Sequence, residues 1–265
     1  AGIRAALSGV PGPAFLEIPM DVLHGEVDLE KIQIPKFRDY RISATAPQHL
    51  IEEGVDLLSR AQTPMVMAGT SLKWSEGGSH LESFLERTSL PCFVNGMARG
   101  EIAWDHPSFL SLTRKEALEK ADLVILAGTP LDFRMKFGKS IPASAVIIQM
   151  DLDETLIGDN RAADLGLVGN IGMNFQLLTK EIERRELTID SSRYRSQLRA
   201  REEELDSARR DEMDSQEVPI DPLRLCREIA DFVSDDMIVI GDGGDIVAQA
   251  SKVIQVPRNG TWMDP

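Results

Sequence analysis

Two kinds of apolar pattern alternate between residues 48 and 182. Short, nearly continuous apolar runs, such as 64–69 and 121–127, are separated by segments such as 49–61, in which apolar residues recur every three or four positions. The runs are typical of strands buried on both faces, and the segments are typical of amphipathic helices. The predicted strands are 64–69, 90–94, 121–127, 145–150 and 165–169, and the predicted helices are 49–61, 80–88 and 115–120. This alternation predicts one α/β domain with a parallel sheet over residues 48–182.

The N-terminal region has a different pattern. Residues 1–8 have the pattern of a helix and residues 14–18 that of a strand, and neither element can bury its apolar face alone. We therefore predict that residues 1–25 end a domain whose remainder lies upstream, in a longer chain. Residues 26–47 are polar and interrupted by prolines, which is typical of an extended linker.

A charged segment and a second α/β pattern follow the central domain. Residues 183–218 carry dense charge of both signs, which favours a solvated helix between domains, with Glu202, Glu203 and Glu204 on its solvent face. At the start of segment 219–265, Asp221 is a plausible N-cap, with Pro222 at the first helical position. The predicted elements of this segment are a helix to Val233, a strand over 237–240 and a helix over 246–253.

Composition narrows the classes of function. The chain has a formal net charge of −14 and 42% hydrophobic residues, as expected of a folded protein that neither binds nucleic acid nor adheres to an anionic membrane. No apolar run approaches the roughly 18 residues of a membrane span, so we expect a cytoplasmic location. The two cysteines, Cys92 and Cys226, lie in apolar surroundings and are expected to be buried thiols rather than a disulfide.

Candidate chemistry gathers where predicted strands end. The sequence Gly241-Asp242-Gly243-Gly244-Asp245 follows a strand and precedes a helix, which suits an anion, although the same pattern also makes an ordinary turn. Polar residues also follow the strands of the central domain, where open α/β sheets bind ligands. They are Gly69-Thr70-Ser71, Asn95 to Gly100, Gly128 to Arg134 and Asp151-Leu152-Asp153.

These residues allow two interpretations. An acidic residue just after a strand suits a ribose, and Arg99 and Arg134 suit a diphosphate. Alternatively, Asp151 and Asp153 cap the next helix and Arg134 pairs with a surface carboxylate. The histidines are scattered, and His106 is most simply a loop hydrogen bonder. No catalytic motif or metal-ligand spacing is recognisable, so these patterns leave the function open.

Three blocks of the chain nevertheless resemble one enzyme family. They are SGVPGPAFLEIPMDV at 8–22; NGMARG at 95–100 with GTPLDFRMKFG at 128–138 and Asp151-Leu152-Asp153; and Ile240 to Asp245 with Thr261 to Pro265. The chain resembles thiamine diphosphate-dependent enzymes of the acetolactate synthase type, on the branch that includes a 2-hydroxyacyl-CoA lyase. The resemblance implies a fragment, in which a parallel-sheet central domain is flanked by parts of the pyrimidine-binding and diphosphate-binding α/β domains.

The family's site residues carry over only in part. The resemblance implies thiamine diphosphate and Mg²⁺ as cofactors, with Gly244, Asp245 and Ile246 near the diphosphate. Related synthases have Gln-His where this chain has Asp245-Ile246. It implies that the catalytic glutamate lies upstream and the metal motif downstream, so we assign no catalytic residue and no metal ligand.

Central domains of this family hold FAD or ADP in some members. The matching positions here are Gly69, Gly128, Asp132, Arg134, Asp151 and Leu152. Asn170 stands where relatives often have Asp, and the glycine-rich loop of flavin binders is reduced to Ala68-Gly69-Thr70-Ser71. Two alternatives therefore remain for the central domain: a flavoprotein-like site, or a nucleotide site that no longer binds a ligand.

The resemblance implies a carbon-carbon synthase or lyase acting on 2-oxo acids. The alternatives are a 2-hydroxyacyl-CoA lyase or oxalyl-CoA decarboxylase-like enzyme, with an acyl-CoA substrate, and a catalytically silent nucleotide-binding or assembly module. We expect the full-length chain to form a homodimer or homotetramer, and the 265-residue piece alone to be inactive.

Overall fold

The computed structural model describes residues 1–33, 44–256 and 261–264, and the chain divides into two compact units, residues 1–42 and 43–265. The helices of the first unit are α1 (Gly2–Leu7), α2 (Met20–Leu23) and the 3₁₀ turn η1 (Leu29–Lys31). Helix α1 confirms the prediction for residues 1–8. The strand predicted over 14–18 is wrong, because no described residue pairs with this segment. Residues 34–43 of the predicted linker lie outside the described residues.

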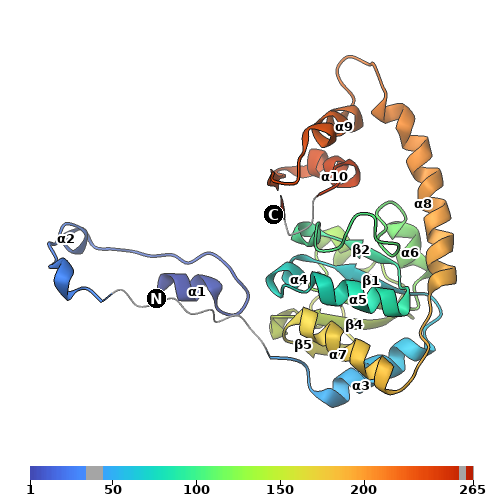
Figure 1. The fold of residues 1–265 in the computed structure, drawn as a ribbon, viewed down its shortest axis with the longest axis horizontal. Helices are drawn as coiled ribbons and strands as arrows, with labels where there is room; N and C mark the ends of the chain where they lie inside the picture. The colour runs from blue at the N-terminus through green and yellow to red at the C-terminus, as the bar shows by residue number, and fades with distance from the viewer. Residues whose placement is uncertain (34–43, 257–260, 265) are drawn as a thin grey trace. The chain divides into compact units, whose positions relative to one another are not determined.

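A parallel sheet forms the centre of the second unit (Figure 1). Its strands are β1 (Pro64–Ala68), β2 (Cys92–Val94), β3 (Leu123–Ala127), β4 (Val146–Asp151) and β5 (Leu165–Val168), in the order β2-β1-β3-β4-β5. A single parallel bridge joins Phe109 to Cys92 on the outer side of β2. With that bridge counted as a strand, the order is that of a doubly wound α/β fold, and the direction of winding changes between β1 and β3. The predicted fold class is confirmed.

Helices cover both faces of this sheet, and each face has its own core. On one face, α3 (Gln48–Arg60), α5 (Gly78–Thr88) and α7 (Ile171–Arg184) pack against side chains such as Val66 and Ile125. On the other face, α6 (Arg114–Lys120) and α8 (Ser192–Met213) pack against Met67 and Leu126. Alternate strand residues thus enter opposite cores, as a sheet covered on both sides requires.

The charged segment differs from its prediction. Helix α8 is present, but its first half lies on the second core, where Tyr194, Leu198 and Glu202 are all buried. The interpretation of Glu202 as part of a solvated face is therefore wrong, whereas Glu203 and Glu204 are exposed as predicted. The sequence analysis also gave no helix for α4 (Thr70–Trp74) or α7.

The C-terminal segment packs beside the central sheet within the same unit. It contains α9 (Pro222–Phe232), β6 (Val239–Ile240), α10 (Gly244–Val253) and β7 (Trp262–Met263), and β6 and β7 pair in parallel. The Asp221 carboxylate accepts hydrogen bonds from the backbone N–H groups of Leu223 and Arg224, which confirms the predicted N-cap. Trp262 is fully buried in the small core of this segment, together with Ile254 and Val256.

Two further expectations have an outcome in the fold. Cys92 and Cys226 are free, buried thiols, as predicted, and burial raises the pKa of both. Within the described ranges, no helix is both long enough and apolar enough to cross a membrane.

Candidate functional site

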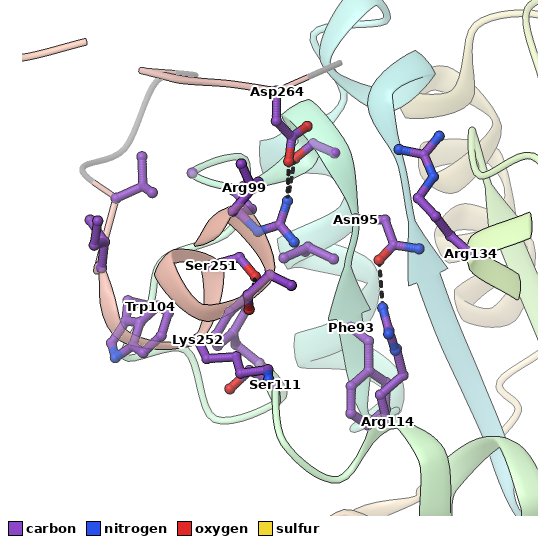
Figure 2. Close-up of a pocket in the computed structure, with 18 of the residues that line it drawn as sticks. Phe93, Asn95, Arg99, Trp104, Ser111, Arg114, Arg134, Ser251, Lys252 and Asp264 are labelled. Atoms are coloured by element: carbon purple, nitrogen blue, oxygen red, sulfur yellow. Dashed lines mark hydrogen bonds and ion pairs between the residues drawn. The ribbon is translucent and has the colours of Figure 1, made fainter. Parts of the chain in front are cut away.

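A cavity of about 670 Å³ lies between the carboxyl end of β2 and helix α10 (Figure 2). The central domain contributes the end of β2, the turn η2 (Gly96–Ala98) and the loop that leads to α6. The C-terminal segment contributes the Gly-rich loop and the inner face of α10. Aromatic side chains make much of the wall, namely Phe93, Trp104, Phe109 and Phe133. The cavity has the size of a site for a drug-sized or cofactor-sized molecule.

Positive charge dominates the polar part of the lining, although the chain as a whole is acidic. The lining cations are Arg99, Arg114, Arg134 and Lys252, and the lining carboxylates are Asp242 and Asp264. Arg134 pairs at 2.7 Å with Asp132, so its charge is compensated. This pairing is the second of the two interpretations that the sequence allows for Arg134.

Arg114 and Lys252 are the cations with neutral hydrogen-bond partners. The Arg114 guanidinium donates to the neutral amide oxygen of Asn95 at 2.7 Å, and Lys252 Nζ donates to the amide oxygen of Gln249 at 3.1 Å. Burial lowers the pKa of Arg114, and burial together with the nearby Arg209 and Arg114 lowers the pKa of Lys252. The neutral amide partners do not compensate these positive charges, so an anion entering the cavity would be attracted to them.

Arg99 fastens the C-terminal segment to the central domain. Its guanidinium donates to the Asp264 carboxylate at 2.8 Å and lies 5.3 Å from the centre of the Trp262 ring. Lys73 on α4 donates to the Trp262 carbonyl at 3.4 Å. Burial lowers the pKa of Arg99, and the attraction of Asp264 opposes that effect. The ion pair thus holds one wall of the cavity against the other.

The predicted nucleotide residues fall into two groups. Arg134 lines the cavity, whereas Gly69, Gly128 and Asp151 lie buried at the ends of β1, β3 and β4. Gly69 N–H donates to the Ala127 carbonyl at 2.8 Å, and a Cβ on Gly69 would lie 2.2 Å from the Gly128 carbonyl oxygen. Close packing of two backbone loops at the point where the winding changes therefore requires glycine, with or without a ligand.

The acidic residues among the predicted nucleotide positions have hydrogen-bond partners within the chain. Burial raises the pKa of Asp151, whose carboxylate accepts from the backbone N–H of Asp153 at 3.2 Å. Asp153 in turn caps the 3₁₀ turn η4 (Glu154–Leu156). Leu152 is 8% exposed, and Asp132 accepts hydrogen bonds from Arg134. The assignment of these residues to a nucleotide stays a prediction.

The predicted diphosphate residues lie at the start of α10. Gly244 lines the cavity with Gly243, while Asp245 and Ile246 are exposed and lie outside its lining. A Cβ on Gly243 or Gly244 would meet no atom within 4 Å, so a ligand can approach this backbone closely. The first N–H groups of the ten-residue helix α10 are available there. This open helix start fits a diphosphate group.

The sequence analysis missed Arg114 and Lys252. Arg114 is the first residue of α6, a position where the helix dipole favours acidic side chains, so an arginine there is a detectable signal. Lys252 gives no such signal, because a lysine in the last turn of a helix is ordinary. Among the described residues, no group of three or more His, Cys, Asp or Glu side chains could hold a metal ion.

Residues 51–179 match the family model for the central domain of thiamine pyrophosphate enzymes. This central segment belongs to that domain family. Thiamine pyrophosphate is another name for thiamine diphosphate. A solved structure with the same fold is benzoylformate decarboxylase from Polynucleobacter necessarius, with a TM-score of 0.68 and 16% identity, over 98% of this chain and 47% of that one.

Curated relatives of the chain include members with different reactions. The chain is 27% identical to 2-hydroxyacyl-CoA lyase 2 of Bos taurus, over 100% of its own length and 48% of the relative. It is 28% identical to a probable acetolactate synthase of Mycobacterium bovis, over 99% and 47%. Oxalyl-CoA decarboxylase of Escherichia coli is 24% identical, over 98% and 48%. The chain thus spans about half the length of these relatives.

Proposed function

We propose that the full-length protein is a thiamine diphosphate-dependent enzyme that forms or cleaves a carbon-carbon bond beside a carbonyl group of a 2-oxo acid. The observation that supports this most directly is the open start of α10, which faces the same cavity as the central domain of this family. When bound, the cofactor supplies a nucleophilic carbon that attacks the carbonyl and accepts an electron pair. The backbone at Gly243 and Gly244 would bind its diphosphate, and Mg²⁺ would accompany it, with no ligand assigned among the described residues.

A second candidate function, action on an acyl-CoA, is favoured by the cations of the cavity. The carboxylate of a small 2-oxo acid needs one cationic partner, whereas Arg114 and Lys252 together suit a ligand that carries several phosphates. The aromatic wall offers apolar surface for the rest of such a molecule. Two of the relatives are named for acyl-CoA chemistry, a 2-hydroxyacyl-CoA lyase and oxalyl-CoA decarboxylase.

FAD or ADP in the central domain is a further part of the proposal. Arg134 reaches the cavity, and Asp151 lies at the end of β4, where a doubly wound sheet offers a ligand site. The pairing of Arg134 with Asp132 and the packing of Gly69 against Gly128 also support the alternative of an emptied site. The absorption spectrum of the purified protein between about 350 and 500 nm distinguishes a bound flavin from ADP or nothing.

Isothermal titration of the full-length gene product tests the main proposal. We expect thiamine diphosphate to bind only in the presence of Mg²⁺. If a demonstrably folded protein binds none under either condition, the enzyme proposal is wrong and the silent nucleotide-binding or assembly module takes its place. The 265-residue piece is expected to show no turnover by itself.

Titration with coenzyme A tests the second candidate. Arg114→Ala should weaken binding by about tenfold or more, because one charge-assisted hydrogen bond is lost. Lys115→Ala is the matched control, since Lys115 is the next residue and its side chain is 87% exposed. Equal affinities of the two variants, or no binding by the wild type, would exclude this cavity as the acyl-CoA site.

We also infer that the full-length chain assembles as a homodimer or homotetramer in the cytoplasm, as the family resemblance implies. Light scattering coupled to size-exclusion chromatography measures the assembly directly, and a monomeric mass would contradict the inference. Fractionation of the source cells tests the compartment.

A further inference from the structure

Helix α8 is fastened to the wall of the cavity. Tyr194 Oη donates to the carbonyl of Ala117 at 3.2 Å, and Arg199 donates to the carbonyls of Pro107 and Phe109. Leu198 of the same helix is buried in the second core. This helix face contacts the segment of residues 107–113. Three residues of that segment line the cavity, namely Phe109, Leu110 and Ser111.

Glu202 makes the most extensive of these contacts. Its carboxylate accepts from the backbone N–H groups of Ser111, Leu112 and Thr113 at 2.6, 2.9 and 3.0 Å. It also accepts from the hydroxyl groups of Ser111 and Thr113 at 3.0 and 2.8 Å. Successive backbone N–H groups that point at one place form an anion-binding concavity, and here a side chain of the same protein fills it.

This contact fixes the start of α6. Thr113 is the N-cap residue of α6, but its hydroxyl donates to Glu202, and no side-chain cap hydrogen bond comes from Thr113 itself. The next residue is Arg114, whose guanidinium reaches the Asn95 amide across the cavity wall. The backbone that carries Arg114 is thus held by a carboxylate from a helix about 90 residues further along the chain.

We propose that Glu202 is a positioning residue that sets the place of Arg114 in the cavity and so determines the affinity for an anionic ligand. The proposal rests on the second candidate function for the identity of that ligand. Glu202 is 8% exposed and lies outside the cavity lining, so it acts through Ser111, Thr113 and Arg114 rather than by contact. Neutralising it would leave five donors without a charged acceptor and release the loop that precedes α6.

The test compares Glu202→Gln with Glu203→Gln in the full-length protein. Glu203 is the next residue on the same helix and is exposed, which makes it a matched control. With coenzyme A as the probe, Glu202→Gln should raise Kd about tenfold, the value of one charge-assisted hydrogen bond, and Glu203→Gln should leave Kd unchanged. The far-ultraviolet circular dichroism spectrum should be the same in all variants, which a general loss of structure would not allow.

A double-mutant cycle separates positioning from a purely structural role. If Glu202 acts through Arg114, then Glu202→Gln combined with Arg114→Ala should bind coenzyme A no more weakly than Arg114→Ala alone. Losses that multiply in the double variant would overturn the proposal, as would equal affinities of the two glutamine variants.

Two further measurements decide the remaining outcomes. If the wild type does not bind coenzyme A, the acyl-CoA candidate fails, and crystal structures of the two glutamine variants then decide the role of Glu202. The 2.7 Å hydrogen bond between Arg114 and Asn95 should be lost only in Glu202→Gln. Its retention in Glu202→Gln would refute the positioning role. If Glu202→Gln does not fold, Thr113→Val removes a single donor and should weaken binding about threefold. No change in that variant would also refute the proposal.

Discussion

Replacing Gly69 with alanine tests whether this glycine is required for packing in the fold or only for the approach of a ligand. The alanine Cβ would lie 2.2 Å from the Gly128 carbonyl oxygen and 2.7 Å from Thr129 Cα, both backbone atoms that cannot swing aside as a side chain would. An ordinary contact needs about 3.4 Å, so the two loops would have to separate by more than 1 Å. That movement also strains the 2.8 Å hydrogen bond from Gly69 N–H to the Ala127 carbonyl.

The expected destabilisation is about 3 kcal/mol, from overpacking of about 2 kcal/mol and about 1 kcal/mol for the strained hydrogen bond. For a domain of this size that amounts to a fall in Tm of about 6–12 °C. Gly244→Ala is the matched control, because its Cβ would meet no atom within 4 Å. It should change stability by less than about 1 kcal/mol, within the range of helix propensity.

The assay is thermal unfolding of ligand-free protein followed by circular dichroism at 222 nm. If Gly69 is glycine only so that a nucleotide can approach, Gly69→Ala would unfold at the wild-type temperature and lose only nucleotide affinity. That result would refute the packing argument and strengthen the assignment of Gly69 to a nucleotide site.

Two more predictions concern buried charge. The pKa of Glu181 is held at about 2 by hydrogen bonds from Arg184 and Arg185, against the opposing effect of burial. Because this pKa is below the ordinary 4.5, the ionised Glu181 stabilises the fold fully above about pH 4.5, and this stabilisation is lost as the pH falls towards 2. In urea unfolding, Glu181→Gln should therefore be less stable than the wild type at about pH 7 and nearly as stable as the wild type near pH 2. Asp264→Asn removes the charged partner of Arg99, whose side chain is 16% exposed. This substitution should lower the free energy of unfolding by about 1–3 kcal/mol and abolish the near-ultraviolet circular dichroism of Trp262. Asp242→Asn, at an exposed position in the same cavity lining, is its control, and equal effects of the two variants would contradict a docking role for the ion pair.

Local patterns in the sequence were sufficient to predict most of the second unit. Strands β1 and β3 are apolar throughout because both of their faces are buried, and this gives an unambiguous signal. The N-cap at Asp221 was predictable because its chemistry lies within three residues. The segment 14–18 shows the limit of such reasoning, since a strand exists only with a partner, and pairing is not a local property.

The cavity was much less predictable than the sheet. Its charged lining joins Arg114, at the start of α6, to Lys252, at the end of α10, and these residues are 138 positions apart. Strand ends were a correct guide to Asn95, Arg99 and Arg134, because parallel strands bring their carboxyl ends to one edge. No comparable rule predicts that the inner face of α10 lines this cavity. Its position depends on the contacts of Arg99 and Lys73 with the C-terminal segment.

Helix α8 shows why the charged segment was misinterpreted. Tyr194, Leu198 and Glu202 follow one another at intervals of four residues, so they share one helix face. The first two are apolar and enter the core, and the third occupies the corresponding position with a carboxylate. A hydrophobicity pattern counts that position as solvent-exposed, because burying a charge without partners is unfavourable. Five donors from residues 111–113 remove this objection, but they lie about 90 residues away in the sequence, so only the folded chain reveals them. A polar residue that continues an apolar stripe is therefore better interpreted as a candidate for a specific buried contact than as the end of the stripe.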